Sequence, residues 1–440
     1  MVERKKLTSG RARRAIRIGG LASQVGSSYL WTTLRKQFLS DDAGQRELLD
    51  VHIRNARRIV ESSKELRGAF MKLIQMLSMR RDILPDQALD VLKLTQSSVP
   101  PMDYKMIAEQ LRRELGKKPE QLFASFEQRA FAAASLGQVH RARLRSGEEV
   151  AVKIQYPGVE ETVDQDLRNL KLLLQTFRAI AHDVMRQKIE TRSIYDELAE
   201  RLKEELDYVN EARNIATFAR LLADDSETMI PRVIPELSSR RVLTMTYLDG
   251  YALADVLAPG VDRALKDWVA RKYYALVWRQ ILEFGVVHTD PHPGNYVVSY
   301  HPRLGILDFG SIRRFPEPLR RAHVKLARAL LDDDARAMGE AMVALGYLDS
   351  RQDRAPMVQI LRILFEPIMT ERAYDPSEYD SLAKAREVGE ITLAHKLYKS
   401  PAHSVFLMRA LVGLEGIIKQ LGCVTKYREI FHRCVERAEA

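Results

Sequence analysis

The sequence predicts an α+β fold in which a small lobe contains most of the strands and a larger lobe is mainly helical. An alternating, β-branched run at 149–155 follows a turn at 145–148 and is expected to pair with 138–142 as a hairpin. A second hairpin is expected from strands at 296–298 and 304–307. Local patterns predict further strands at 230–234 and 241–245 and helices around 262–284, 317–345, 354–370 and 402–421.

The most informative motif surrounds the second hairpin. The segment 288–295 reads HTDPHPGN, and the tripeptide Asp308-Phe309-Gly310 follows the hairpin. Asn295 comes five positions after Asp290, which is the separation in the catalytic loop of kinases. Phosphoryl transfer needs a carboxylate beside the nucleophile, here Asp290, and an amide and a second carboxylate that hold Mg²⁺, here Asn295 and Asp308. We expect His288 to support the loop rather than to transfer a proton.

A site of this kind also needs a lysine on an early strand that contacts the nucleotide phosphates. Lys153 follows Val150-Ala151-Val152 and fits that role. The alternative is a solvated lysine that protects a sheet edge. A helical glutamate must orient the lysine, and a single helix predicted over 193–222 offers Glu205, Asp207 and Glu211. Periodicity does not rank these acids, and we favour Glu211.

An alanine-rich loop stands where a kinase would have its glycine-rich phosphate loop. Its residues are Ala132, Ala133, Ala134 and Ser135. Each Cβ restricts the backbone angles that a glycine would allow, so we expect the nucleotide to be held in a different pose. A helix or a packed turn is the alternative, but the position directly before the lysine hairpin favours nucleotide binding. Tyr247 begins the expected hinge, whose backbone would contact adenine.

These motifs together resemble the UbiB or AarF-domain family of atypical kinases, from about residue 60 to the end of the chain. The resemblance implies a bilobal, protein-kinase-like fold that binds ATP and Mg²⁺. We therefore expect four parts, which are a basic N-terminal arm or helix at 1–58, a family-specific helical extension at 59–117, a kinase-like N-lobe at 118–246 and a C-lobe at 247–440.

In that family the extension carries the motif Lys-x-Gly-Gln and covers the site where a protein kinase admits its peptide substrate. Lys72 and Gln75 match the motif, whereas Ile74 replaces its glycine. A β-branched side chain prevents the close approach that glycine allows. By resemblance, Glu205 and Asp207 are the expected contacts of Lys72 and Gln75.

The net charge of +10 is concentrated near the N-terminus, where residues 1–40 contain nine Lys or Arg and one acid, a net charge of +8. Such an arm can attract anionic lipid, or it can be a soluble tail. We expect no nucleic-acid partner because no recognised reading module accompanies the charge. The uncharged segment 18–34 is too polar to span a membrane, so the sequence predicts a cytoplasmic protein, soluble or peripheral to a membrane.

The resemblance implies an atypical kinase or ATPase that supports isoprenoid-quinone or related lipid metabolism, with quinone-pathway proteins as partners. Two alternatives stay open. A small-molecule kinase of the choline or aminoglycoside type shares the His-x-Asp loop and the later Asn, but it does not predict the alanine-rich loop or the Lys72 extension. A nucleotide-gated adaptor would bind ATP and lipid without turnover.

Overall fold

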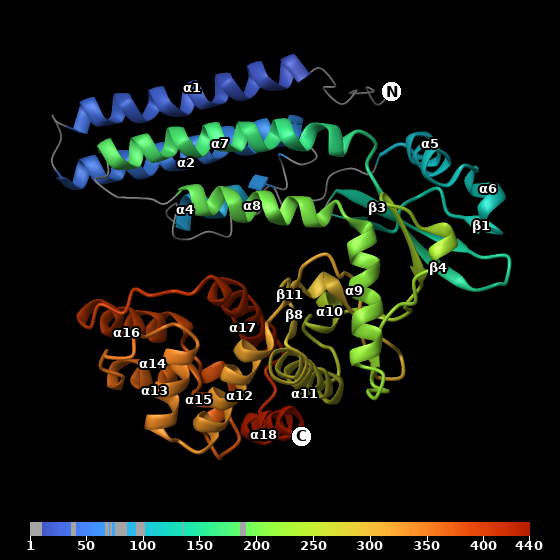
Figure 1. Cartoon of the computed structure of the whole chain (residues 1–440). Helices are drawn as coiled ribbons and strands as arrows, with labels where there is room; N and C mark the ends of the chain where they lie inside the picture. The colour runs from blue at the N-terminus through green and yellow to red at the C-terminus, as the bar shows by residue number, and fades with distance from the viewer. Residues whose placement is uncertain are drawn as a thin grey trace. The chain divides into compact units, whose positions relative to one another are not determined.

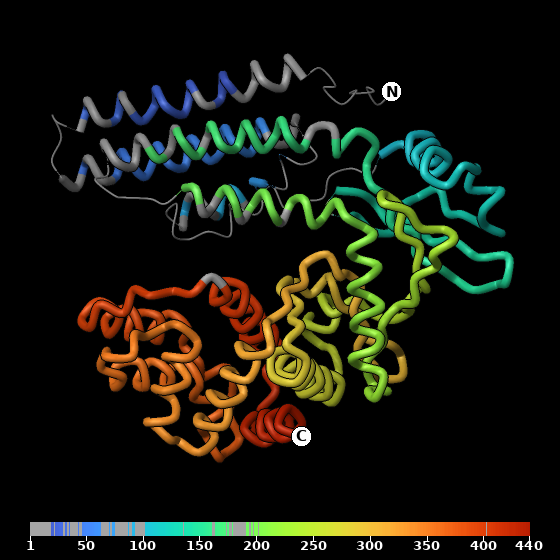
Figure 2. Tube along the Cα trace, viewed as in Figure 1, coloured from blue at the N-terminus to red at the C-terminus, as the bar shows by residue number. Residues whose placement is uncertain are grey.

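The structure is a computed structural model that describes residues 11–36, 41–66, 70, 73–74, 86–93, 102–134, 136–184 and 191–440. Figure 1 labels the helices and strands, and Figure 2 follows the same chain along its Cα atoms. The chain forms two compact units, one within 1–210 and 233–247 and the other within 211–232 and 248–440. Both contain helices and strands, so the predicted α+β class is confirmed.

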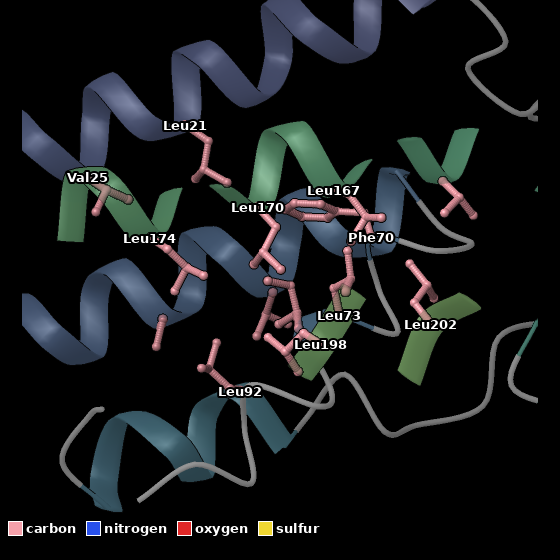
Figure 3. Close-up of a cluster of buried hydrophobic side chains, with 14 of the residues drawn as sticks. Leu21, Val25, Phe70, Leu73, Leu92, Leu167, Leu170, Leu174, Leu198 and Leu202 are labelled. Carbon is pink, nitrogen blue, oxygen red and sulfur yellow. The ribbon is translucent and has the colours of Figure 1, made fainter. Parts of the chain in front are cut away.

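Five helices of the first unit share one apolar core. They are α1 (Arg11–Lys36), α2 (Asp41–Leu66), α4 (Asp86–Lys93), α7 (Val159–Val184) and α8 (Thr191–Glu205). Figure 3 shows Leu21 of α1, Leu170 of α7 and Leu198 of α8 directed into this core. Val163, Leu167, Leu170 and Leu174 recur at helical spacing on α7 and are at most 4% exposed, so they form one buried face of the helix.

The segment that resembles the family extension contributes to the same core. Phe70, Leu73 and Ile74 are fully buried there. Ile74 therefore supplies apolar packing at the position where the family motif has glycine. Lys72 and Gln75 lie outside the described residues. Helix α2 continues through residue 58, and the four-part division of the chain stays a prediction.

The first unit also contains an antiparallel sheet with the strand order β1-β3-β4-β6 and with β2 paired to β3. Gly137 opens β3, and a Cβ there would lie 2.3 Å from the carbonyl oxygen of Ile154, so only glycine allows this close pairing with β4. The strands are β1 (Ser125–Phe126), β2 (Ala132–Ala134), β3 (Gly137–Arg143), β4 (Glu149–Gln155) and β6 (Val242–Thr246), and helices α5 (Tyr104–Leu115) and α6 (Pro119–Leu122) and the 3₁₀ turn η2 (Pro235–Leu237) accompany them.

The single helix expected over 193–222 is wrong, because the chain forms two helices there, α8 and α9 (Tyr208–Leu221). The amides of Leu206 and Asp207 donate to carbonyls only three residues earlier, which ends α8. The Asp207 carboxylate then accepts the amide of Asn210 at 2.9 Å and so caps the start of α9.

In the second unit the predicted hairpin forms, and its strands β9 (Tyr296–Val298) and β10 (Leu304–Ile306) lie in a four-stranded sheet with the order β5-β10-β9-β7. No regular strand forms over 230–234, where only an isolated antiparallel bridge joins Val233 to Met245 of β6. Strand β5 (Thr228–Met229) lies earlier, and Pro231, which has no amide proton, follows it. The remaining strands are β7 (Tyr251–Ala252), β8 (Val286–His288) and β11 (Ile312–Arg314).

Helices form the rest of the second unit. The helices expected over 317–345 and 354–370 are each broken into two, and Asp334 caps the second helix of the first pair. Three α-helices of this unit, α10, α16 and α18, were not predicted. The elements are α10 (Leu253–Val256), α11 (Arg263–Arg279), η3 (Gln280–Phe284), η4 (Pro293–Asn295), α12 (Glu317–Leu331), α13 (Ala335–Ala344), α14 (Ala355–Leu364), α15 (Glu366–Met369), η5 (Pro376–Glu378), α16 (Ser381–Ala394), α17 (Ala402–Leu421) and α18 (Tyr427–Glu439).

A buried charge cluster joins the segment after α9 to α11. Arg279 contacts Asp225 at 3.1 Å and Glu283 at 2.7 Å, and Lys272 contacts Asp225 at 2.5 Å. Burial raises the pKa of Asp225, but the hydrogen bond and positive charge of Lys272, with smaller contributions from Thr228 and Arg279, leave the pKa below its ordinary value. The stability that this shift contributes is present above the ordinary carboxyl pKa and is lost as the pH falls.

Among the described helices, none is long and apolar enough to cross a membrane.

Candidate active site

The loop 288–295 is held by backbone pairing at one end and by a side-chain cap at the other. Strand β8 pairs with β11, with His288 opposite Ile312, and the amide of Thr289 donates to the carbonyl of Ser311 at 2.9 Å. At the other end, Nδ1 of His292 accepts the amide of Gly294 at 3.0 Å and caps η4. This arrangement fixes the ends of the segment that contains Asp290.

His288 links the loop to the Asp308 tripeptide. Its Nδ1 accepts the amide of Asp290 at 3.2 Å. Nε2 therefore carries the proton and donates it to the carbonyl oxygen of Asp308 at 2.7 Å. The imidazole is 4% exposed, and both of its nitrogens are used in these bonds. This geometry is that of a supporting residue.

The carboxylate of Asp290 is held by two side chains. Nδ2 of Asn295 donates to Oδ2 of Asp290 at 3.0 Å, and the guanidinium of Arg409 lies 3.1 Å from Oδ1. Both partners are hydrogen-bond donors, and each binds a different oxygen of the carboxylate. Asp290 is thus oriented by the loop itself and by α17, 119 residues later.

The oxygens that could hold Mg²⁺ lie on adjacent backbone. The amide of Leu307 donates to the carbonyl of Asn295 at 2.9 Å. This bond pairs the backbone at Leu307 with that at Asn295, so Asp308, the next residue, lies close to Asn295. The hydrogen bonds of the Asn295 side chain use its nitrogen, so its Oδ1 is the atom that can bind a cation. Oδ1 of Asp308 accepts the amide of Gly310 at 2.9 Å, which orients the carboxylate.

This donor set fits a metal that arrives with a nucleotide. Across the described ranges, no group of three or more His, Cys, Asp or Glu side chains could hold a metal ion. Mg²⁺ commonly takes one or two protein oxygens and completes its octahedron with water and phosphate oxygens. Asn295 and Asp308 can supply two such oxygens, one amide and one carboxylate.

The buried Tyr296 lies near these groups, with its ring centre 6.0 Å from that of His288. It is 1% exposed, and burial holds the pKa of its phenol well above the ordinary value, with the charges of Asp290 and Asp308 acting in the same direction. The phenol therefore stays neutral near the two carboxylates and adds no negative charge beside the candidate cation site.

Helix α9 contacts the Asp308 tripeptide through one face. The carboxylate of Glu211 accepts the amide of Phe309 at 3.4 Å, and Nδ2 of Asn214 donates to the carbonyl of Phe309 at 3.0 Å. The rings of Phe218 and Phe309 meet edge to face with centroids 5.3 Å apart. Glu211 is 2% exposed, so the favoured acid lies buried beside the tripeptide.

Lys153 lies on an interior strand of the first unit, opposite Val139 on one side and Leu243 on the other. It is 8% exposed, and its Nζ lies 5.1 Å from the centre of the Tyr208 ring. The alternative interpretation, a solvated lysine at a sheet edge, is wrong. The role of Lys153 at phosphates stays a prediction.

The alanine-rich segment forms a strand rather than a helix or a packed turn. Ala132 pairs with Val139 and Ala134 with Gly137, as β2 of the sheet, while Ser135 lies outside the described residues. The ring of Phe131 meets Tyr247 edge to face at 5.7 Å. The amide of Tyr247 donates to the carbonyl of Glu149 at 3.0 Å, so its amide is already used within the sheet.

The segment between α8 and α9 is held against the lysine strand. Nε2 of Gln155, which is 1% exposed, donates to the carbonyl of Leu206 at 2.7 Å. Leu206 lies between Glu205 and Asp207 in the sequence, so this bond fixes the backbone between the two acids. Asp207 is also the cap of α9, a structural role that was not predicted.

Three contributors to the site were not predicted. Asn214 and Phe218 follow Glu211 by three and seven positions, the spacing of one helical face, so that spacing could have identified them once Glu211 was chosen. No local pattern indicates Arg409.

The family model, the curated relatives and the solved structure that resemble this chain agree with one another. Residues 94–342 match the ABC1 atypical kinase-like domain. The mitochondrial atypical kinase COQ8B of Rattus norvegicus is 30% identical over 444 residues, which cover 98% of this chain and 82% of that protein. An uncharacterized chloroplastic aarF domain-containing protein kinase of Arabidopsis thaliana is 30% identical over 90% of this chain, which spans only 54% of that protein.

A solved structure shows the same fold. A Mycobacterium tuberculosis protein in complex with erythromycin matches with a TM-score of 0.62 over 89% of this chain and 97% of its own, at 24% identity. At that identity the likeness concerns the fold alone.

Proposed function

Because this chain belongs to the ABC1 atypical kinase-like family, we propose that it binds Mg-ATP and hydrolyses it, or transfers its phosphoryl group slowly, in support of isoprenoid-quinone or related lipid metabolism at a membrane surface. The resemblance to the UbiB or AarF-domain family and the protein-kinase-like fold are confirmed. The COQ8 atypical kinases among the relatives support the quinone pathway. One observation carries the enzymatic part: Asp290, Asn295 and Asp308 are joined by a continuous set of hydrogen bonds.

The proposed mechanism assigns one task to each group. Asp290, held by Asn295 and Arg409, would orient the attacking water or hydroxyl and accept its proton. Asn295 and Asp308 would bind Mg²⁺, which neutralises phosphate charge when bound. Lys153 would contact the phosphates, and Glu211 would orient Lys153.

The nucleotide would contact the strand-rich part of the first unit. Ala132, Ala133, Ala134 and Ser135 would lie against the phosphates, and Tyr247 would lie at the hinge near adenine. Because the amide of Tyr247 is bonded to Glu149, its carbonyl is the group we assign to the nucleotide. Lys72 and Gln75 would belong to the extension that limits peptide access, and Glu205 and Asp207 would be their contacts.

The membrane part of the proposal rests on charge. Residues 1–40 have a net charge of +8, enough to attract anionic lipid headgroups. We therefore expect ATP hydrolysis by the purified protein to rise several-fold with phosphatidylserine-containing vesicles and to show no such rise with neutral vesicles. The stimulation should disappear in about 0.5 M salt because exposed charges are then screened.

The same measurement separates the alternatives. Mg-ATP binding without turnover under every condition would favour a nucleotide-gated adaptor. Turnover that depends on an added amino alcohol or aminoglycoside, and not on vesicles, would favour a small-molecule kinase. Equal stimulation by neutral and anionic vesicles would contradict the charge argument while leaving the ATPase in place.

A further inference from the structure

The second unit contains an apolar pocket of about 170 Å³ within its helical part. Helices α11, α14, α15, α17 and α18 all contribute to its lining. The residues of the catalytic loop and the Asp308 tripeptide do not line it. The pocket therefore differs from the site proposed for Mg-ATP.

Aromatic side chains form much of its wall. The aromatic residues of the lining that are at most 8% exposed are Tyr274, Trp278, Tyr374, Tyr379 and Tyr427. The rings of Tyr274 and Tyr427 are 4.8 Å apart, and the hydroxyl of Tyr427 donates to the carbonyl of Cys423 at 2.8 Å. These contacts hold the rings in place without a ligand, so the pocket is preformed.

The charged side chains of the lining are already bonded to protein groups. Nζ of Lys419 donates to the carbonyl of Tyr379 at 2.8 Å, and the carboxylate of Glu415 accepts the hydroxyl of Ser381 at 2.5 Å. A charged ligand buried between aromatic rings would lose its hydration and find no partner for its charge, which is unfavourable. The lining therefore favours an uncharged occupant.

The volume limits the size of that occupant. An apolar cavity of about 150 Å³ in another protein stays dry and accepts benzene. A pocket of about 170 Å³ accordingly accommodates one six-membered ring with a small substituent. Met408 and Val412, which are 46% and 57% exposed, lie at its open side and give such a molecule access.

We propose that this pocket binds an uncharged compound with a single aromatic ring. The proposal goes beyond the nucleotide chemistry and does not depend on it. One wall is α17, on which Met408, Leu411 and Val412 line the pocket, while Arg409 contacts Asp290. A bound ring thus packs against the helix that orients the Asp290 carboxylate.

Calorimetric titration of the full chain without nucleotide tests the proposal, with toluene as the probe and benzoate as its charged counterpart. Toluene should bind at one saturable site, and benzoate should bind at least about tenfold more weakly because its charge is not paired. Absence of saturable toluene binding, or equal binding of benzoate, would overturn the proposal.

A pair of variants on α17 locates the site. Leu411→Trp places an indole in the pocket and should weaken toluene binding at least about tenfold by filling the space. Val405→Trp changes an exposed residue of the same helix outside the lining and should bind toluene like the wild type. Equal affinities in the two variants, with unchanged circular dichroism, would overturn the assignment. If Leu411→Trp does not fold, the wild-type comparison of toluene with benzoate decides.

Discussion

Replacing Asp290 by asparagine is expected to lower ATP turnover at least about a hundredfold, because the amide cannot accept the proton of the nucleophile. The side chain keeps its shape, and its oxygen can still accept the hydrogen bond from Asn295 or Arg409. The KM for Mg-ATP should therefore change little while kcat falls. Steady-state kinetics with a coupled ADP assay would measure both values.

Asp255→Asn is a suitable control for Asp290→Asn. Asp255 is an exposed residue of α10 in the same unit, so the same chemical change there should leave kcat unaltered. Wild-type kcat in Asp290→Asn, with proper folding, would refute the assignment of Asp290 as the catalytic carboxylate. An equal fall of kcat in both variants would indicate that the loss of one negative charge, and not the loss of a particular carboxylate, lowers the rate.

Gly413→Ala is expected to disturb the loop 288–295 from a distant part of the sequence. A Cβ at Gly413 would lie 1.9 Å from Cγ and 2.1 Å from Cβ of Pro291, so α17 or the loop must move. The proline ring is rigid, and overpacking of this kind costs about 1–3 kcal/mol. Since Pro291 follows Asp290, the shift should also lower kcat, by as much as about a hundredfold for a displacement near 1 Å.

Gly416→Ala provides the matched control. It lies one turn further along α17, and a Cβ there meets nothing within 4 Å. Alanine should stabilise the helix by up to about 1 kcal/mol at this position and leave turnover unchanged. Thermal unfolding and kcat, measured for both variants, test the contact. Similar behaviour of the two alanine variants would show that α17 does not pack on the loop as described.

Local patterns predicted the elements that contain most of the candidate site residues. Strand β4 has the predicted bounds of 149–155, because its alternation and the preceding turn are both readable within a few residues. Helix α17 also has its predicted bounds, 402–421, and the hairpin that joins Asn295 to Asp308 forms. The placement of Lys153, Asn295 and Asp308 on strands and loops follows from these patterns.

Other features depended on contacts that no local pattern contains. The break at Leu206 and Asp207 interrupts a run with good helical spacing, and the Asp207 cap becomes evident only with the backbone in view. Helix α16 buries no residue, so its sequence has no clear apolar face to read. The contacts of α17 with the loop 288–295, through Arg409 and Gly413, join residues more than 100 positions apart.

The Mg²⁺ dependence of ATP binding tests the central claim most directly, with wild type compared with Asp308→Asn. Asparagine retains an acceptor for the amide of Gly310, so the turn should persist while the anionic metal ligand is lost. We expect Mg²⁺ to tighten ATP binding by the wild type at least about tenfold over EDTA, and the variant to lose this gain. An equal gain from Mg²⁺ in the variant, or no ATP binding by the wild type, would contradict the account.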